Sequence, residues 1–193
     1  MRNKLIEIAE NEVGYLEKTS NSQLDDKTAN AGRGNWTKYG VWYGQGKNGY
    51  AWCAMFVSWC AAMADIPESV IPKFHSCTSG GKTFFKKAGR WKPRADYTPE
   101  PGDIIFFTNG NPPTQADHVG IVRAVDAVRV YTVEGNTSGG STLIDNGGGV
   151  ARKSYALTYS KILGYGHPDY QEGINMTIDE ARNELTTVTR TGD

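Results

Sequence analysis

The sequence predicts an α+β fold, with helices first along the chain and an antiparallel sheet after them. Two observations predict it. Apolar residues before residue 90 recur at spacings of three and four, as in helices packed on one face. After residue 100, short Val- and Ile-rich runs alternate with turn residues, as in strands. With 193 residues, 38% of them hydrophobic, the chain can form one domain with a substantial core.

Three longer helices and one short one are expected in the first half. The first is amphipathic and ends near Gly14, a natural stop. The strongest covers residues 52–64, where apolar side chains form one stripe and Pro67 closes the segment. A weaker helix runs over residues 77–88. Between the first two lies a long irregular segment, residues 15–50, rich in Asn, Gly and aromatic residues, with a short helix expected around residues 36–39.

Five strands are expected in the second half, over residues 104–107, 119–125, 128–133, 150–157 and 162–165. The Gly-, Ser- and Asn-rich residues 135–149 are expected to form a mobile lip. We assign residues 1–168 to one domain and the polar residues 169–193 to a tail or linker, with a short helix near 177–185.

Composition excludes several classes of function. Lys plus Arg and Asp plus Glu both number 21, so the formal net charge is zero and nothing indicates a nucleic-acid partner. No apolar run reaches membrane-spanning length, and the N-terminus lacks the apolar core of a signal peptide, so we expect none. Three cysteines are an odd number, which excludes a full disulfide framework and predicts at least one free thiol.

A cysteine, a histidine and a carboxylate follow one another in the order of a thiol hydrolase. Cys53 lies where a glycine-rich loop enters the strongest helix, so the free amides and dipole of the helix end favour its nucleophilic thiolate form. His118 opens one predicted strand, and Glu134 closes the next. We predict Cys53 as nucleophile, His118 as base, and Glu134 or, less favoured, Asn136 as the acceptor that orients the imidazole.

The predicted hairpin between His118 and Glu134 sets a geometric condition. A three-residue loop over residues 125–127 would place His118 directly opposite Glu134, on one face of the sheet. A two-residue turn would place the two side chains on opposite faces. A catalytic pair therefore requires an odd-length loop or a bulge. Gly120 would leave room beside the imidazole for a helix end or a substrate. The amide of Cys53 is the expected oxyanion donor, with a second from residues 47–50.

Each of these residues could also have a purely structural role. A mid-helix cysteine such as Cys60 is expected in the core. Cys77 is a rival nucleophile without a strand-borne carboxylate, and is not favoured. His118 alone could be an ordinary sheet histidine, and Glu134 a solvated charge. A zinc set of Cys53, Cys60, His75 and Cys77 lacks a CxxC pair, so no metal site is predicted there.

Four segments together resemble the CHAP family of cysteine- and histidine-dependent amidohydrolases and peptidases. They are Trp52–Cys60, Pro101–Phe107, His118–Val122 and Val133–Thr137. Residues 14–39 look like a phage or prophage endolysin branch of that family. The resemblance implies a papain-like fold, peptidoglycan as substrate and amide hydrolysis, with Asn136 as an auxiliary polar residue. Related sequences often have a polar residue after the nucleophile, where this chain has Ala54, and no wall-binding module is evident.

The resemblance also concerns ligands. Some family members bind calcium near the N-terminus, and Asp25, Asp26 and Asn30 offer oxygen ligands, although the EF-hand pattern is absent and no cofactor is required by the chemistry. Trp36, Trp42, Tyr50 and Trp52 are candidates to line a glycan or peptide groove; a minor core beneath the loop is the alternative.

The function expected from the sequence is therefore peptidoglycan hydrolysis by a thiol mechanism through an acyl-enzyme, as an amidase or an endopeptidase. A thiol peptidase acting on proteins and a non-catalytic wall-binding module are the alternatives. The enzyme would be made in the cytoplasm of an infected or lysogenic host and act on the wall after membrane breach.

Overall fold

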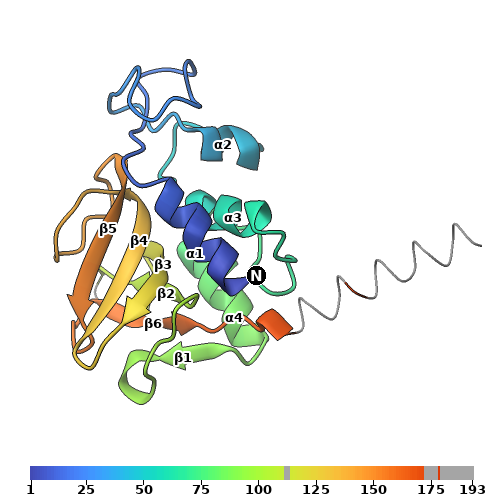
Figure 1. The fold of residues 1–193 in the computed structure, drawn as a ribbon, viewed down its shortest axis with the longest axis vertical. Coiled ribbons are helices and arrows are strands. Elements are labelled where there is room, and N and C mark those ends of the chain that lie inside the picture. Colours follow the sequence, from blue (N-terminus) through green and yellow to red (C-terminus); the bar gives the residue numbers. More distant parts are fainter. Residues whose placement is uncertain (111–113, 172–177, 179–193) are drawn as a thin grey trace, which may run out of the picture.

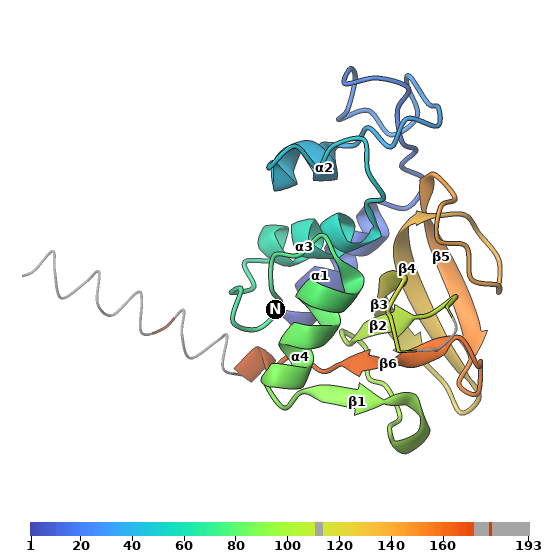
Figure 2. The ribbon, with the colours of Figure 1, turned by 180° about the vertical axis from the view of Figure 1, so that it is seen from behind.

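The computed structural model describes residues 1–110, 114–171 and 178. Helices from the first half of the chain pack against one six-stranded antiparallel sheet, and the predicted α+β class is confirmed (Figure 1). Seen from behind, α4 lies near one end of β6, and α2 lies beside the long N-terminal loop, where its Tyr39 ring packs against Phe56 and Trp59 of α3 (Figure 2). No helix in the described part of the chain is long and apolar enough to cross a membrane.

The helices follow the apolar patterns closely. Helix α1 (Arg2–Asn11) buries Leu5 and Ala9, and α3 (Cys53–Met63) is buried along most of its length. The short α2 (Lys38–Tyr43) begins two residues later than predicted, because the Thr37 side chain caps it by accepting the Gly40 amide. The predicted helix over residues 77–88 consists of a π-helix, η1 (Cys77–Lys82), continued by α4 (Thr83–Lys87).

The sheet has the strand order β1-β6-β2-β3-β4-β5. Its strands are β1 (Trp91–Pro93), β2 (Ile104–Phe107), β3 (His118–Val125), β4 (Arg129–Thr137), β5 (Gly149–Ala156) and β6 (Ile162–Gly166). A 3-10 turn, η2 (Arg94–Asp96), follows β1. The five predicted strands are present. The sixth, β1, is a three-residue edge strand too short to give a period-two pattern. Strand β4 runs to Thr137, so Glu134 lies inside it and not at its end.

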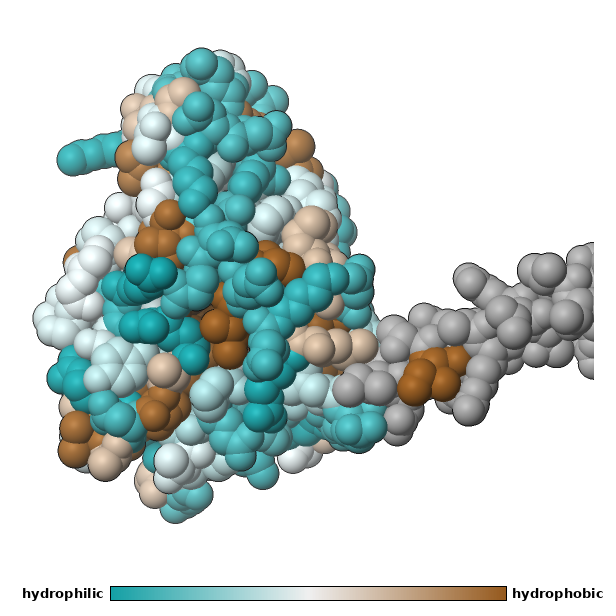
Figure 3. Space-filling model, in the orientation of Figure 1, coloured by the Kyte–Doolittle hydropathy of each residue, from teal (hydrophilic) through white to brown (hydrophobic). Residues whose placement is uncertain are grey.

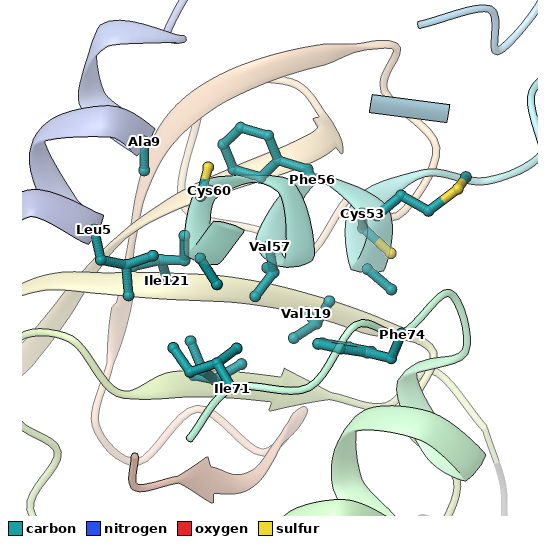
Figure 4. Packing of buried hydrophobic residues seen from close by; sticks show 14 of the residues in the cluster. Leu5, Ala9, Cys53, Phe56, Val57, Cys60, Ile71, Phe74, Val119 and Ile121 are labelled. Atoms are coloured by element: carbon teal, nitrogen blue, oxygen red, sulfur yellow. The ribbon is translucent and has the colours of Figure 1, made fainter. Parts of the chain in front are cut away.

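Two apolar clusters cover the two faces of the sheet. The larger lies between the helices and the sheet, and includes Leu5 from α1, Val57 from α3 and Ile121 from β3 (Figure 4). Cys53 lies at one end of this cluster. The smaller cluster covers the other face, with members such as Phe107, Val122 and Tyr155. On the surface shown in Figure 3, hydrophobic residues form separate spots among hydrophilic ones.

Helix α3 approaches the sheet closely at one glycine. A Cβ on Gly135 of β4 would lie 2.6 Å from Cβ of Phe56 and 2.8 Å from the ring of Trp52. Because real Cβ atoms do not approach so closely, only glycine lets α3 rest on β4 here. This contact places the start of α3 beside the ends of β3 and β4.

The predicted boundary between the domain and its tail lies at residue 168. The Tyr170 side chain still packs on the domain, and its hydroxyl donates a 2.6 Å hydrogen bond to the carbonyl of Gly102. The predicted helix near 177–185 falls almost wholly outside the described residues. The division at residue 168 stays a prediction, as does the mobility of residues 135–149, of which 135–137 belong to β4.

Candidate active site

Cys53 is the first residue of α3, where the backbone offers unpaired donors. The first intrahelical bond runs from the Phe56 amide to the Trp52 carbonyl, so the preceding amides of the turn have no intrahelical acceptor. The Ala54 amide donates to the Cys53 sulfur. The side chain is 4% exposed and none of the three cysteines is in a disulfide. The thiol therefore lies, largely dry, at the positive end of a helix.

His118 and Glu134 form a buried pair on adjacent strands. The Nε2 of His118 lies 2.9 Å from Oε2 of Glu134, and both side chains are fully buried. The other ring nitrogen, Nδ1, has no nitrogen or oxygen partner among the described residues. The Cys53 thiol is the group that interacts with the ring besides Glu134. The structure thus brings together the three predicted residues in the order thiol, imidazole and carboxylate.

A bulge provides the geometry that the hairpin required. Strands β3 and β4 pair as Ile121 with Val133 and Val122 with Thr132, but then Ala124 with Tyr131, so Arg123 is an extra residue. Of the two geometries that the hairpin allowed, an odd-length loop or a bulge, the structure has the bulge, so His118 does not lie directly opposite Glu134. The bulge restores the common face, and Glu134 reaches His118 diagonally. The space above Gly120 is filled by the Glu134 side chain, where a substrate or helix end had been expected.

Two further hydroxyl groups hold the carboxylate of Glu134. Thr132 Oγ1 donates to Oε1 at 2.5 Å, and Tyr155 Oη donates to Oε2 at 3.2 Å. Sequence reasoning missed both residues. Thr132 is two residues from Glu134 on the same strand face, a spacing that could have indicated it, whereas Tyr155 comes from β5 and depends on strand pairing. Together they fix the acceptor that orients His118.

The ionisation of the site favours a thiolate and an imidazolium. A hydrogen bond with Cys77 and, after it, the contact with His118 lower the pKa of Cys53 well below its usual range, although burial opposes this. Burial alone would lower the pKa of His118, but Cys53 and Glu134 together raise it to about 10. An imidazole that keeps its proton beside a thiol that loses its own is the charge distribution of an activated nucleophile.

Cys77 is a neighbour that the sequence did not place at the site. Its Sγ lies 3.7 Å from the Sγ of Cys53, and it is the first residue of η1. Burial and the bond with Cys53 raise the pKa of its thiol well above the usual range, the bond being the larger cause. Cys77 thus stays protonated and donates to the Cys53 thiolate. Cys60 lies in the core, as predicted.

Within the described part of the chain, no hydrogen bond joins Asn136 to the imidazole of His118. Its Nδ2 donates to the Asp145 carbonyl at 3.2 Å, and its backbone carbonyl accepts from Gly147 at 2.9 Å. Its φ of 57° is unusual for a residue other than glycine. Asn136 therefore anchors the loop after β4, while Glu134 holds His118, and the alternative in which Asn136 orients the ring is not the arrangement found.

The four candidate groove aromatics are not equivalent. Trp52 is fully buried and stacks on Tyr39, with its Nε1 donating to Glu17 at 3.1 Å, so its predicted contact with substrate is wrong. Trp36 and Trp42 are half-buried, and the Lys73 ammonium lies over the Trp42 ring. Tyr50 is 63% exposed.

A small cavity lies near the start of α3. Its volume is about 220 Å³, and it is lined by Lys47, Tyr50, Ala51, Met55 and His75. Ala51 and Met55 are each two residues from Cys53, so the cavity borders the start of α3. Tyr50 is the predicted groove aromatic that lies here, and the predicted donor loop, residues 47–50, forms one wall.

Two of the three residues expected to offer calcium ligands, Asp26 and Asn30, already form hydrogen bonds within their own segment. Asp26 Oδ1 accepts the amides of Thr28 and Ala29, both at 2.8 Å, and the Lys18 ammonium also acts on this carboxylate. The Asn30 amide group donates to residues 20 and 22. Among described residues, no group of three or more His, Cys, Asp or Glu could hold a metal. These residues do not fit a calcium site well; calcium stays a prediction, and no step below depends on it.

Comparisons with known proteins bear on the same segment. Residues 45–136 match the CHAP domain family. No curated protein matches the sequence. Two solved structures, "The crystal structure of Ly7917" and "The crystal structure of Ly7917 with the hydrolyzing product of MDP", are 15% and 14% identical, with TM-scores of 0.48 and 0.46. Each alignment covers 87% of this chain and 62% of the other, so this chain spans less than two thirds of their length.

The matched range contains Cys53, His118 and Glu134, the three residues that the structure brings together. Residues 45–136 of this chain are thus similar to the CHAP domain family, and the candidate site lies within them.

Proposed function

We propose that this protein is a peptidoglycan hydrolase that cleaves an amide bond of the bacterial cell wall with Cys53 as nucleophile. The observation that carries the proposal is the buried cluster of Cys53, His118 and Glu134 within the segment similar to the CHAP domain family. The family match supports the reaction class, and the cluster supplies each group that amide hydrolysis by a thiol needs.

Acylation follows from the ionisation of the pair. The Cys53 thiolate attacks the carbonyl carbon of the scissile amide. The unpaired amides at the start of α3, that of Cys53 first, are suited to receive the charge that develops on the carbonyl oxygen. The imidazolium of His118 then gives its proton to the leaving amine, and a thioester to Cys53 remains.

Deacylation uses the same groups in reverse. Neutral His118 accepts a proton from water, whose oxygen attacks the thioester carbonyl and releases Cys53 as thiolate. Glu134, held by Thr132 and Tyr155, keeps Nε2 protonated and directs Nδ1 toward the sulfur. The imidazolium that forms is stabilised by the same carboxylate.

The biological setting is also proposed. The N-terminal motifs support an endolysin-like role, in which a phage or prophage enzyme is made in the host cytoplasm and meets the wall after membrane breach. Tyr50, beside the cavity near the start of α3, is the groove aromatic best placed to contact a glycan or peptide.

The test is mass spectrometry of soluble fragments released from purified sacculi by wild type, Cys53→Ala and Cys60→Ala. We expect wild type and Cys60→Ala to release fragments with new amino termini or whole stem peptides, and Cys53→Ala to release none. The fragment masses identify the bond. Equal release by Cys53→Ala would overturn the nucleophile, and activity on casein but not on sacculi would favour a protein-directed thiol peptidase.

A further inference from the structure

Two cysteine sulfur atoms are in contact at the candidate active site. Sγ of Cys53, at the start of α3, lies 3.7 Å from Sγ of Cys77, at the start of η1. Neither belongs to a disulfide. The hydrolytic steps above use Cys53 but require no covalent chemistry of Cys77. Two thiols in contact, one of them a nucleophilic thiolate, can be oxidised to a disulfide.

We propose that Cys53 and Cys77 form a reversible modification site, at which a small peroxide such as hydrogen peroxide converts the two thiols into a disulfide that blocks the nucleophile. The site stands on the thiol pair itself, and only its consequence for activity rests on the proposed hydrolysis.

The reaction balances in two steps. The Cys53 thiolate attacks one peroxide oxygen; an S–O bond forms, the O–O bond breaks, and the departing hydroxide takes a proton to become water. The Cys77 sulfur then attacks Cys53; an S–S bond forms, and the oxygen leaves as a second water with the proton that Cys77 gives up. Two thiols are oxidised by two electrons in total, and one peroxide is reduced to two waters.

The geometry favours the intramolecular product. A disulfide needs an S–S distance of about 2.05 Å, so from 3.7 Å only a small approach of the two side chains is required. Cys77 begins a π-helix, a rare conformation frequently found at functional sites. The approach joins the first residues of α3 and η1, whose sulfur atoms are already in contact.

A cavity borders the two segments that carry the cysteine pair. The cavity of about 220 Å³ is lined by Ala51, Met55 and His75, which lie two residues from Cys53 or from Cys77. A water-sized molecule needs far less space than this. Cys53 and Cys77 keep 4% and 7% of their surface exposed, whereas Cys60 keeps none. The third cysteine is therefore a built-in control that should remain a thiol.

The experiment counts thiols. Reduced wild-type protein is treated with hydrogen peroxide, denatured, alkylated with iodoacetamide and weighed intact, with peptide mapping to locate each label. We expect three alkyl groups before treatment and one, on Cys60, afterwards, with the loss of two hydrogen atoms and no added oxygen. Dithiothreitol should restore all three groups and the release of sacculus fragments.

Matched variants distinguish disulfide formation between Cys53 and Cys77 from unspecific oxidation of cysteine. Cys77→Ser removes the second sulfur, and we expect Cys53 then to gain one or more oxygen atoms and to recover poorly with dithiothreitol. Cys60→Ala should form the disulfide as wild type does. The proposal is overturned if wild type keeps three alkylatable thiols under peroxide concentrations that oxidise Cys53 in Cys77→Ser, or if oxygen adducts form equally in both proteins.

The chemical readout also separates this proposal from the proposed function. Disulfide formation in a protein that releases nothing from sacculi would support the modification site and contradict the hydrolase. Hydrolysis without disulfide formation would do the reverse.

Discussion

Helix α3 carries two cysteines, Cys53 and Cys60, seven residues apart, and the pKa values of their thiols are shifted in opposite directions. At the start of the helix, Cys77 and His118 lower the pKa of Cys53. In the middle, burial raises the pKa of Cys60, with Glu12 adding to it. Both side chains are buried in the apolar layer beneath α3. Donors and a cation at the helix end, and not the residue type or burial, therefore distinguish a nucleophile from a core residue.

The largest expected effect is the loss of activity on replacing one thiol but not the other. Cys53→Ala should reduce clearing of a sacculus suspension to background, because the attacking atom is removed. Cys60→Ala should clear the suspension at nearly the wild-type rate after correction for folded protein, since only core packing changes. The decrease in turbidity measures both. Comparable loss in the two variants would contradict the distinction.

Removing the charge that supports His118 should be the next largest effect. In Glu134→Gln the imidazolium loses a carboxylate, so activity should fall roughly 10²- to 10⁴-fold. The active wild-type form needs protonated His118, so its activity should decline as pH rises through about 10. In Glu134→Gln this pKa is lower, and the decline should move to lower pH. A pH–rate profile of both proteins measures the shift; an unmoved alkaline limb would show that Glu134 does not hold the imidazolium.

The two thiols should also differ in their reaction with iodoacetamide. The lowered pKa of Cys53 leaves thiolate at neutral pH, so its alkylation should slow only when pH falls through that lowered value. The raised pKa of Cys60 leaves it protonated. Because each pKa unit changes the thiolate population about tenfold, we expect at least a ~10-fold faster labelling of Cys53 at pH 7. Peptide mapping over time measures both rates, and equal rates would remove the basis of the comparison.

The smallest effect concerns the contact that positions the helix start. Gly135→Ala places a Cβ against Phe56 and Trp52, and we expect a loss of roughly 1–3 kcal/mol of unfolding free energy. Gly139→Ala is the matched control, because nothing lies within 4 Å of its added Cβ, and it should change stability by less than about 0.5 kcal/mol. Urea unfolding midpoints compare the two. Equal stability would mean that α3 does not rest on β4 as described.

The elements that the sequence predicted well are those with a strong local pattern. The stripe of apolar residues in 52–64 predicted α3 to within a residue at each end, and the apolar run 104–107, which follows turn residues, predicted β2. The short β1 and the π-helical turn at Cys77 have no such pattern, because three residues are too few for a period and π-helices have no residue preference strong enough to read. Trp52 was misplaced because an aromatic beside a nucleophile has the same sequence pattern whether it lines a groove or fills a core.

The sequence by itself determined the fold class, the helix that starts at Cys53 and the three residue types of the candidate site, because these depend on periodicity and on order along the chain. Only the tertiary structure decided how they meet. The bulge at Arg123, the hydroxyls of Thr132 and Tyr155 on Glu134, and the contact of Cys77 with Cys53 join segments far apart in the chain or depend on strand register. A shift of one residue in register moves every side chain of a strand to the other face of the sheet. Because β3 and β4 are buried on both faces near the site, their apolar pattern does not set that register.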